Sequence, residues 1–300
     1  MIPVNPLYCS GLFIEPLIHP KPGGVTRVVS HSDKSIYNFI VNNLLFCKSI
    51  LEQPIIDRRD CIIGEAFRNI VANLRKYRLE INTSMGSWLL HVPIILSAEI
   101  LGKSDVSSVK SLVDVSSQLV KSADSCDAKG YFELLRYYSP SHLGKLRKGG
   151  VDVNDYNKEN LPSFYDVIRR ASQTDIVHRE IIRGYPASLE ASNSINNYVR
   201  KGFNFEESVF QTILYLMSKH IDTLIARKYG ITVAKKVLRM SKLVFEGDLE
   251  YSVMDSFMKS NKLNPGSILD IVSMGITFYF TSNLGSDFDE KAMIDLIQGR

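Results

Sequence analysis

Along most of the chain, apolar residues recur three and four positions apart, which is the spacing of one face of an amphipathic α-helix. The 204–229 stretch shows this pattern best. There Asn204 is a good N-cap, Glu207 completes a capping box and Gly230 can end the helix. Further helices are predicted over residues 34–51, 64–78, 88–101, 106–122, 128–137, 161–182, 232–244, 251–260 and 265–280.

Strand-like alternation is rare and short, and no repeat of fixed period occurs along the chain. The sequence has 300 residues, of which 45% are hydrophobic, and this is enough to bury a large core. No Pro/Gly/Ser-rich linker or low-complexity run divides it. The pattern therefore predicts an all-α fold, and we expect residues 1–300 to form a single compact domain of many helices.

Charge adds little to this picture. The formal net charge is +4, from 36 basic and 32 acidic residues that are spread along the chain. Because no block is rich in Lys and Arg, nucleic-acid binding is not predicted. A mild positive excess is compatible with anionic small molecules such as nucleotides, and equally with a plain soluble protein.

The cysteines and the apolar stretches bear on location. Cys9, Cys47, Cys61 and Cys126 are far apart, without a C-x-x-C pair or the His spacing of a zinc site, which fits a reducing cytoplasm. The N-terminal stretch lacks the basic and apolar regions of a secretory signal. The apolar runs at 88–96 and 268–280 contain polar residues and fall short of roughly 18 to 20 uninterrupted positions. We therefore expect a cytoplasmic protein with no membrane span.

A polar loop is predicted over residues 19–33, where two prolines and two glycines, among them Gly23, exclude a regular helix. Four residues with ionisable side chains lie in this loop: Lys21, Arg27, His31 and Asp33. Such a loop can offer backbone N–H groups and cations to phosphate oxygens, and a carboxylate to a metal ion. A surface turn with solvated charges is the alternative, since Lys-Pro-Gly is common turn chemistry.

Two further segments offer a helix start and a charged pair. Asn82 and Thr83 are good N-cap residues, and Gly86 allows close approach of a ligand or another backbone. A capped helix start is a possible anion site, and plain capping is the alternative. Asp175 and Arg179 lie four positions apart, so they share one face of their predicted helix. They either pair with each other or point at a substrate.

Residues 139–155 read as a long basic loop that contains Lys145, Arg147 and Lys148. Loops of this length inside compact domains are often functional. A solvated charge cluster is equally compatible with the composition.

Two carboxylates fall on apolar helix faces. Asp222 lies near the end of the strongest predicted helix, where it needs a partner or a metal ion, and Arg227 follows in the last turn. The last predicted helix begins with Asn264 as a cap, and Gly266 leaves its N-terminal backbone open to a phosphate. Asp270 follows in the next turn and must meet a cation, a metal ion or water, so structural pairing and a catalytic role both stay open.

Taken in order, several of these segments resemble the signature blocks of the triphosphoribosyl-dephospho-CoA synthase family. The blocks are a Glu followed by P-K-P-G, an H-x-D, an N-T-x-x-G, a D-T-L-I-x-R and a final N/S-P-G-x-x-x-D. They stand here as Glu15 with PKPGG, His31-Ser32-Asp33, NTSMG, DTLIARK and NPGSILD. Several ordered blocks, spanning residues 15 to about 280, are far more specific than any one of them.

The resemblance implies an all-α fold whose polar loops converge on a nucleotide pocket. It also implies transfer of a ribose-5-triphosphate unit from ATP to the ribose 2′-hydroxyl of 3′-dephospho-CoA, with release of adenine, to make a prosthetic-group precursor. Mg²⁺ is the expected cofactor. A triphosphate needs contacts from Lys and Arg, and Mg²⁺ needs carboxylates.

Roles for individual residues follow from the same resemblance. Glu15 is expected to be the general base for the attacking hydroxyl. Asp33, Asp222 and Asp270 are expected to be catalytic, as metal ligands or as stabilisers of positive charge. Substrate-binding residues are expected at Lys21, Gly23, Arg27, His31, Asn82, Thr83, Gly86, Asp175, Arg179, Arg227, Asn264 and Gly266.

The chain departs from the family pattern at two blocks. Members that serve citrate or malonate lyases carry N-T-H-K-G, whereas this chain has NTSMG and lacks the His and Lys. Residues 139–144 read SPSHLG where relatives tend to show a P-G-G-L-G loop. Two alternatives therefore stand beside the leading interpretation: a divergent relative that acts on a different nucleotide or phosphorylated pentosyl substrate, and a non-catalytic helical binding protein.

Overall fold

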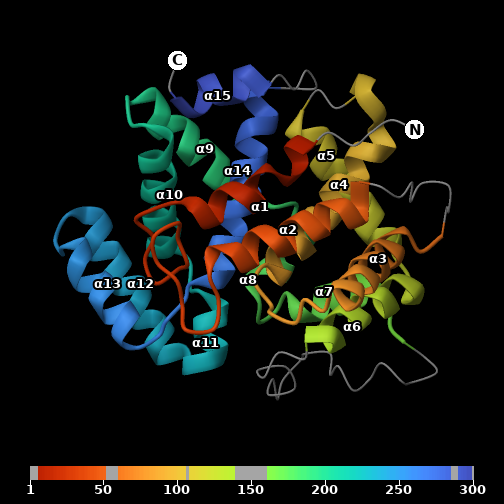
Figure 1. Cartoon of the computed structure of the whole chain (residues 1–300), viewed down its shortest axis with the longest axis horizontal. Coiled ribbons are helices and arrows are strands. Elements are labelled where there is room, and N and C mark those ends of the chain that lie inside the picture. Colours follow the sequence, from red (N-terminus) through yellow and green to blue (C-terminus); the bar gives the residue numbers. More distant parts are fainter. Residues whose placement is uncertain (1–5, 52–59, 106–107, 139–160, 285–289, 299–300) are drawn as a thin grey trace. The chain divides into compact units, whose positions relative to one another are not determined.

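The computed structural model describes residues 6–51, 60–105, 108–138, 161–284 and 290–298 (Figure 1). Every regular element within these ranges is a helix, which confirms the predicted all-α fold. The chain divides into two compact units, residues 1–9 with 38–185 and residues 10–37 with 186–300. The expectation of one domain stays a prediction, and the two units are described separately.

Unit 1 packs around the apolar helix α4. Its elements are η1 (Pro6–Cys9), α2 (Ile36–Leu51, from residue 38 onward), α3 (Ile62–Tyr77), α4 (Met85–Asp105), α5 (Val109–Ser122), α6 (Ser125–Tyr138), α7 (Phe164–Ala171) and α8 (Ile176–Arg183). Trp88 on α4 is fully buried, stacks on Phe46 with ring centroids 5.3 Å apart and donates a hydrogen bond to Asn43. These contacts fix α2 against α4.

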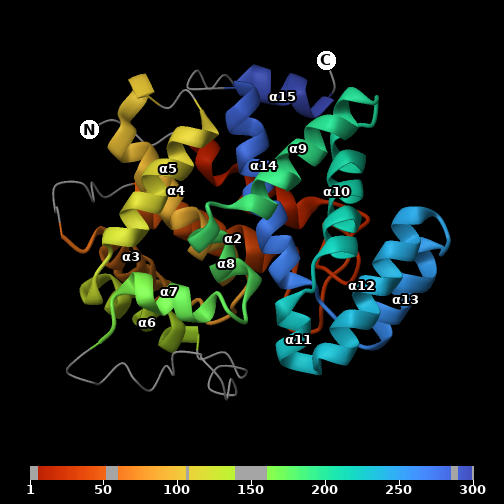
Figure 2. The ribbon, with the colours of Figure 1, turned by 180° about the vertical axis from the view of Figure 1, so that it is seen from behind.

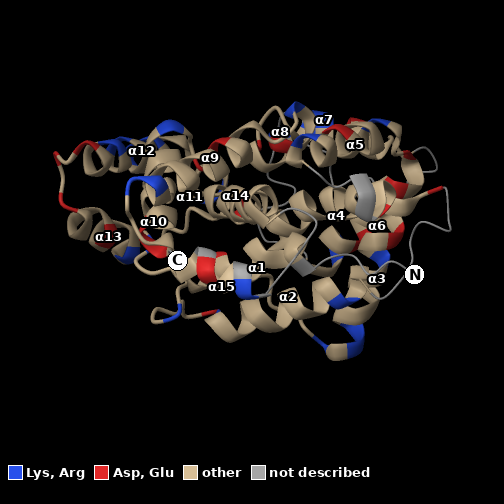
Figure 3. Ribbon diagram, turned by 90° about the horizontal axis from the view of Figure 1, so that it is seen from above, with Lys and Arg blue, Asp and Glu red and all other residues tan. Residues whose placement is uncertain are grey.

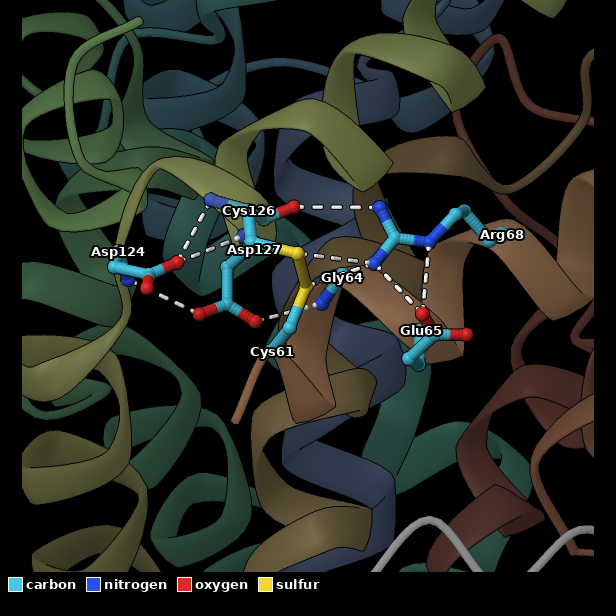
Figure 4. Close-up of polar contacts among 7 residues, drawn as sticks. All are labelled: Cys61, Gly64, Glu65, Arg68, Asp124, Cys126 and Asp127. Atoms are coloured by element: carbon cyan, nitrogen blue, oxygen red, sulfur yellow. Dashed lines mark hydrogen bonds and ion pairs between the residues drawn. A yellow bond between two sulfur atoms is a disulfide. The ribbon is translucent and has the colours of Figure 1, made fainter. Parts of the chain in front are cut away.

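Helices α3 and α6 make the closest approach in unit 1. A Cβ atom on Gly130 would lie 2.2 Å from the carbonyl oxygen of Gly64, so only glycine fits there. A disulfide between Cys61 and Cys126 joins the same two helices (Figure 4). Asp127 accepts a hydrogen bond from the Gly64 amide at 2.8 Å. The sequence separation of 65 residues explains why cysteine spacing alone did not reveal this pair.

Helix α4 bears on the question of whether the chain could span a membrane. Its segment Met85–Gly102 is long and apolar enough to cross a membrane, by length and composition only. However, 67% of that segment is buried within the protein, as in the core helix of a soluble protein. The expectation of no membrane span stays a prediction.

Unit 2 surrounds a second apolar helix, α14. Its elements are α1 (Ser10–Ile14), η2 (Glu15–Leu17), α9 (Pro186–Arg200), α10 (Phe205–Lys219), α11 (Thr223–Tyr229), α12 (Ile231–Glu246), α13 (Tyr251–Ser260), α14 (Gly266–Leu284) and α15 (Glu290–Gln298). Helix α14 is buried along most of its length, with α9 and α10 beside it (Figure 2). Lys and Arg gather on α12 (Figure 3).

Two predicted helices are wrong in extent. The 204–229 helix is broken into α10 and α11, because Asp222 is the N-cap of α11 and not an interior residue. The 161–182 helix is likewise broken into α7 and α8, with Asp175 as the N-cap of α8. The capping box of Asn204 and Glu207 is confirmed at the start of α10. In both broken helices an Asp takes up backbone N–H groups and starts a new helix.

Candidate active site

The loop predicted over residues 19–33 folds back on the connection between α13 and α14 within unit 2. Gly23 has φ +61°, and a Cβ atom there would lie 2.2 Å from the carbonyl oxygen of Leu263. The Nε2 atom of His31 lies 3.0 Å from the carbonyl oxygen of Gly23 and closes the loop on itself. Burial lowers the pKa of His31, while the hydrogen bond to Gly23 opposes this shift. Because Gly23 has no side chain, the loop can pack against the α13–α14 connection.

This loop forms one wall of a cavity of about 520 Å³. The other walls come from α11, α13 and the α13–α14 connection. The cavity is lined by Gly23, Gly24, Val29, Ser30, His31, Ser32, Asp33, Lys34, Lys228, Tyr229, Met258, Lys259, Lys262, Leu263 and Asn264. Of the predicted site residues, the structure brings Gly23, His31, Asp33 and Asn264 together here.

Four lysines line the cavity, and one of them, Lys259, forms an ion pair with Asp255. The four are Lys34, Lys228, Lys259 and Lys262, and Asp33 is the single carboxylate among the lining residues that the structure describes. Burial lowers the pKa of Lys34, and the nearby Lys228 adds to this effect while Asp33 and Asp270 oppose it. Such a cavity favours an anion with several negative charges, because each lysine can donate a charge-assisted hydrogen bond.

Asn264 lines the same cavity. Its side-chain oxygen is buried, with almost no exposed surface, and receives no hydrogen bond from any residue in the described ranges. Asn264 does not cap α14 as the sequence suggested. The carboxylate of Asp222 does so, by accepting from the Ile268 amide at 2.9 Å.

A second cavity of about 200 Å³ adjoins the first and shares Gly24, Val29 and Lys259 with it. Its remaining lining residues are His19, Pro20, Lys21, Thr26, Tyr251 and Asp255. His19, Pro20, Lys21 and Thr26 belong to the predicted loop 19–33. Tyr251 and Asp255 were not predicted, because α13 contains none of the signature blocks and their spacing of four is also what an ordinary exposed helix shows.

Glu15 and Lys21 form a buried ion pair in unit 2. The Lys21 ammonium lies 2.6 Å from the Glu15 carboxylate and donates to the Glu15 carbonyl oxygen at 2.9 Å. Only 2% and 8% of the two side chains are exposed, so little water screens the pair. Burial raises the pKa of Glu15 and lowers that of Lys21, and each partner opposes the shift of the other. Their charges are thus directed at each other.

Arg27 is not among the residues that line the larger cavity. It is exposed, forms an ion pair with Glu206 on α10 and donates to the carbonyl oxygen of Leu17 at 3.1 Å. Arg227 lies in α11, partly buried, and Gly266 is the first residue of α14. A Cβ atom on Gly266 would lie 2.7 Å from a methyl carbon of Leu224, at the flexible end of that side chain.

Asp222 holds two helix starts together. One carboxylate oxygen accepts from the Ile225 amide of α11 at 2.8 Å, and the other accepts from the Ile268 amide of α14 at 2.9 Å. The side chain is buried, and burial raises its pKa to about 6. Because both oxygens are bonded to backbone amides, Asp222 does not suit the role of metal ligand.

The described residues contain no group of three or more His, Cys, Asp or Glu side chains that could hold a metal ion. Asp33 is exposed and Asp270 is partly buried, and both carboxylates raise the pKa of Lys34, against the effect of its burial. The three predicted metal ligands therefore do not form a metal site by themselves.

The other predicted substrate residues lie in unit 1. Asn82 precedes α4, Thr83 accepts hydrogen bonds from Asn42 and Ser84, and Gly86 lies in the first turn of α4. Asp175 caps α8 by accepting from the Val177 and His178 amides. Arg179 donates to the Ser172 and Gln173 carbonyl oxygens at the end of α7. Asp175 and Arg179 thus bond to backbone groups, with Asp175 at the N-cap and not inside the helix, and their role as substrate contacts stays a prediction. The basic segment 139–155 lies outside the described residues.

The described part of the chain is thus all-α, and unit 2 has a cavity lined by four lysines. The model of the family described as ATP:dephospho-CoA triphosphoribosyl transferase matches residues 4–288. The chain therefore belongs to that family, as the signature blocks predicted.

A similar protein from Malonomonas rubra is assigned as a 2-(5''-triphosphoribosyl)-3'-dephosphocoenzyme-A synthase. It is 28% identical over 134 residues, and the match spans 42% of each chain. A crystal structure from Archaeoglobus fulgidus, assigned as a triphosphoribosyl-dephospho-CoA synthase, shares the fold with a TM-score of 0.60 at 19% identity. It covers 81% of this chain and 98% of its own.

Proposed function

We propose that this protein transfers a 5-triphosphoribosyl unit from ATP to the ribose 2′-hydroxyl of 3′-dephospho-CoA and releases adenine. Family membership supports the reaction. The observation that carries it is the lysine-lined cavity of unit 2, which suits a triphosphate. In this reaction the bond from C1′ to adenine breaks, adenine leaves with the bonding electrons, and the 2′-oxygen forms a new bond to C1′ as it loses its proton.

Lys34, Lys228 and Lys262 would hold the triphosphate, since the ammonium of Lys259 is already paired with Asp255 at 2.5 Å.

Mg²⁺ would enter with the phosphates of ATP, since this ion is usually held by one or two carboxylates together with substrate phosphates. Asp33 and Asp270 are the carboxylates beside Lys34 and would serve it. We also carry forward Glu15 as the general base, Gly23 and His31 as substrate contacts, and a cytoplasmic location without nucleic-acid or membrane partners.

The test is release of free adenine, followed by chromatography after the protein is mixed with ATP, Mg²⁺ and 3′-dephospho-CoA. We expect release to require the acceptor. Lys34→Met and Lys262→Met should each lower kcat/KM about 10- to 100-fold, the effect of losing a hydrogen bond to a charged group. Lys242→Met, on the exposed surface of α12, is the matched control and should change little.

Two results would count against the proposal. Absence of adenine release with the folded protein would remove the reaction itself. Lysine variants as active as Lys242→Met would show that the cavity is not where the triphosphate binds.

A further inference from the structure

The disulfide between Cys61 and Cys126 in unit 1 lies beside a cation. The Nη2 atom of Arg68 on α3 is 2.7 Å from the Cys61 sulfur and 3.3 Å from the Cys126 sulfur (Figure 4). Its Nη1 atom donates to the carbonyl oxygen of Cys126 at 3.4 Å. A disulfide sulfur is only a weak acceptor, whereas a thiolate gains a charge-assisted hydrogen bond from a guanidinium. The position of Arg68 therefore favours the reduced form.

Both cysteines also lie at the start of a helix. Cys61 is the N-cap of α3, and Cys126 is in the first turn of α6. A helix N-terminus carries a partial positive charge, which lowers the pKa of a thiol placed there. Both residues are partly exposed, in contrast to the free cysteines Cys9 and Cys47, which are buried. The disulfide thus combines partial exposure with two features that stabilise a thiolate.

Carboxylates lie around the same bond. Asp124 and Asp127 accept hydrogen bonds from backbone amides of α6 and α3, at 2.7 and 2.8 Å. Glu65 pairs with Arg68 at 2.9 Å and so weakens the positive charge that the sulfur atoms experience. Arg68 and Glu65 therefore act on the thiols in opposite directions.

Helices α3 and α6 also touch away from the sulfur atoms, through Gly64 and Gly130 and through the hydrogen bond of Asp127. Breaking the disulfide therefore leaves the two thiols side by side and close to Arg68. In a reducing cytoplasm, which is the location predicted for this chain, disulfides are usually transient and redox-active.

We propose that Cys61 and Cys126 form a reversible redox site, which a dithiol reduces and a disulfide reoxidises, and in which Arg68 stabilises Cys61 as the leaving thiolate. One thiolate of the dithiol attacks the Cys126 sulfur, the S–S bond breaks, and its electron pair goes to the Cys61 sulfur. The second sulfur of the dithiol then attacks its partner in the mixed disulfide and releases the Cys126 thiolate. The dithiol loses two electrons and becomes a disulfide, and its two thiol protons balance the two new thiolates.

The test follows each cysteine of the full chain by alkylation with iodoacetamide and peptide mass spectrometry. With dithiothreitol, the folded protein should lose the disulfide at a rate within about tenfold of that of the chain unfolded in urea. An inert structural disulfide would react about 100-fold more slowly when folded, because reduction would wait for local unfolding. In the reduced protein, alkylation of Cys61 should reach half its maximal rate below about pH 7.5, against about pH 8.5 for an ordinary thiol.

Three variants separate the role of Arg68 from simple exposure. Arg68→Met should slow reduction of the folded protein about 3- to 10-fold and move the alkylation midpoint of Cys61 to about pH 8.5 or above. Glu65→Gln should move that midpoint to lower pH, because it removes the competing carboxylate. Arg75→Met is the matched control, since Arg75 is an exposed arginine seven positions further along α3, and it should change neither quantity.

Two results would overturn the proposal. One is slow reduction of the folded wild type, a measurement that needs no variant and so stays decisive if Arg68→Met fails to fold. The other is an alkylation midpoint that is the same in the wild type, Arg68→Met and Glu65→Gln, since Arg68 would then not act on the sulfur atoms. Neither measurement depends on adenine release, so the redox site and the proposed function are tested separately.

Discussion

Replacing Asp222 tests whether this signature carboxylate is structural or catalytic. In Asp222→Ala, the amides of Ile225 and Ile268 both lose their acceptor. Each loss removes the N-cap interaction of one helix, which costs about 0.5–2 kcal/mol. The site is buried, so water does not replace the carboxylate well. We expect the free energy of unfolding to fall by about 2–4 kcal/mol in total. Asp222→Asn keeps one acceptor and should lose about half as much.

The pH dependence gives a second prediction from the same group. Burial raises the pKa of Asp222 from 3.8 to about 6, so the folded protein holds this proton more tightly than the unfolded chain. Its contribution to stability is fully present below pH 3.8 and is lost as the pH rises through about 6. The change amounts to about 3 kcal/mol at most. Asp222→Asn lacks this titration, so its stability relative to wild type should rise over the same interval.

Urea unfolding followed by far-UV circular dichroism, at pH 4.5 and pH 7.5, measures both effects. Ser108→Ala removes the single exposed cap of α5 and should cost only about 1 kcal/mol, which makes it the control. The reasoning is refuted if Asp222→Ala unfolds within 0.5 kcal/mol of wild type, a difference of about the size expected at an ordinary surface position. Loss of adenine release in such a stable variant would restore the catalytic role.

Three further experiments test the packing and the buried charges. Lys21→Met should lower the free energy of unfolding by about 3–5 kcal/mol, because it leaves Glu15 charged and buried. Adding Glu15→Gln should recover most of this loss in urea unfolding, and no recovery would mean that the pair does not interact. Gly130→Ala should cost about 1–3 kcal/mol in thermal unfolding, because its Cβ would force α3 and α6 apart, and an unchanged Tm would contradict that close contact. Burial lowers the pKa of His91 from 6.5 to about 4, so the stability that this group contributes above pH 6.5 is lost as the pH falls towards 4. His91→Gln should flatten the plot of unfolding free energy against pH over this interval. A plot parallel to that of the wild type would refute the assignment.

Local signals predicted most of the fold. The predicted boundaries of α13 are those of the structure, and the capping box at Asn204 marks the start of α10. Helix α9 was missed because its sequence contains many Ser and Asn residues, which favour turns and caps over helix interiors. In the structure its small residues Ala191 and Ser192 pack against Gly275 of α14, a tertiary contact that no local pattern reveals.

The site was predicted in part, for a related reason. His31 and Asn264, from two of the signature blocks, line one cavity, but the cations that line it are mostly from outside those blocks. Lys21 was expected to contact phosphate, and only the fold shows that Glu15 neutralises it. Asp222 was expected to face a ligand, since the apolar period continues past it and hides the break between α10 and α11. The fold decides which charged side chains form ion pairs and which can bind a ligand, and the sequence alone does not show those pairs.

The Cys61–Cys126 bond matters chiefly for the unfolded chain. It joins two helices that already touch through Gly64 and Gly130, so it adds little to the folded arrangement. When the chain unfolds, however, the bond closes a ring across 65 positions and removes conformations that an open chain would sample. That restriction is worth about 4 kcal/mol of entropy at 25 °C in the loop-closure model. The protein can therefore keep one shape in oxidising and reducing surroundings while its resistance to heat differs between them.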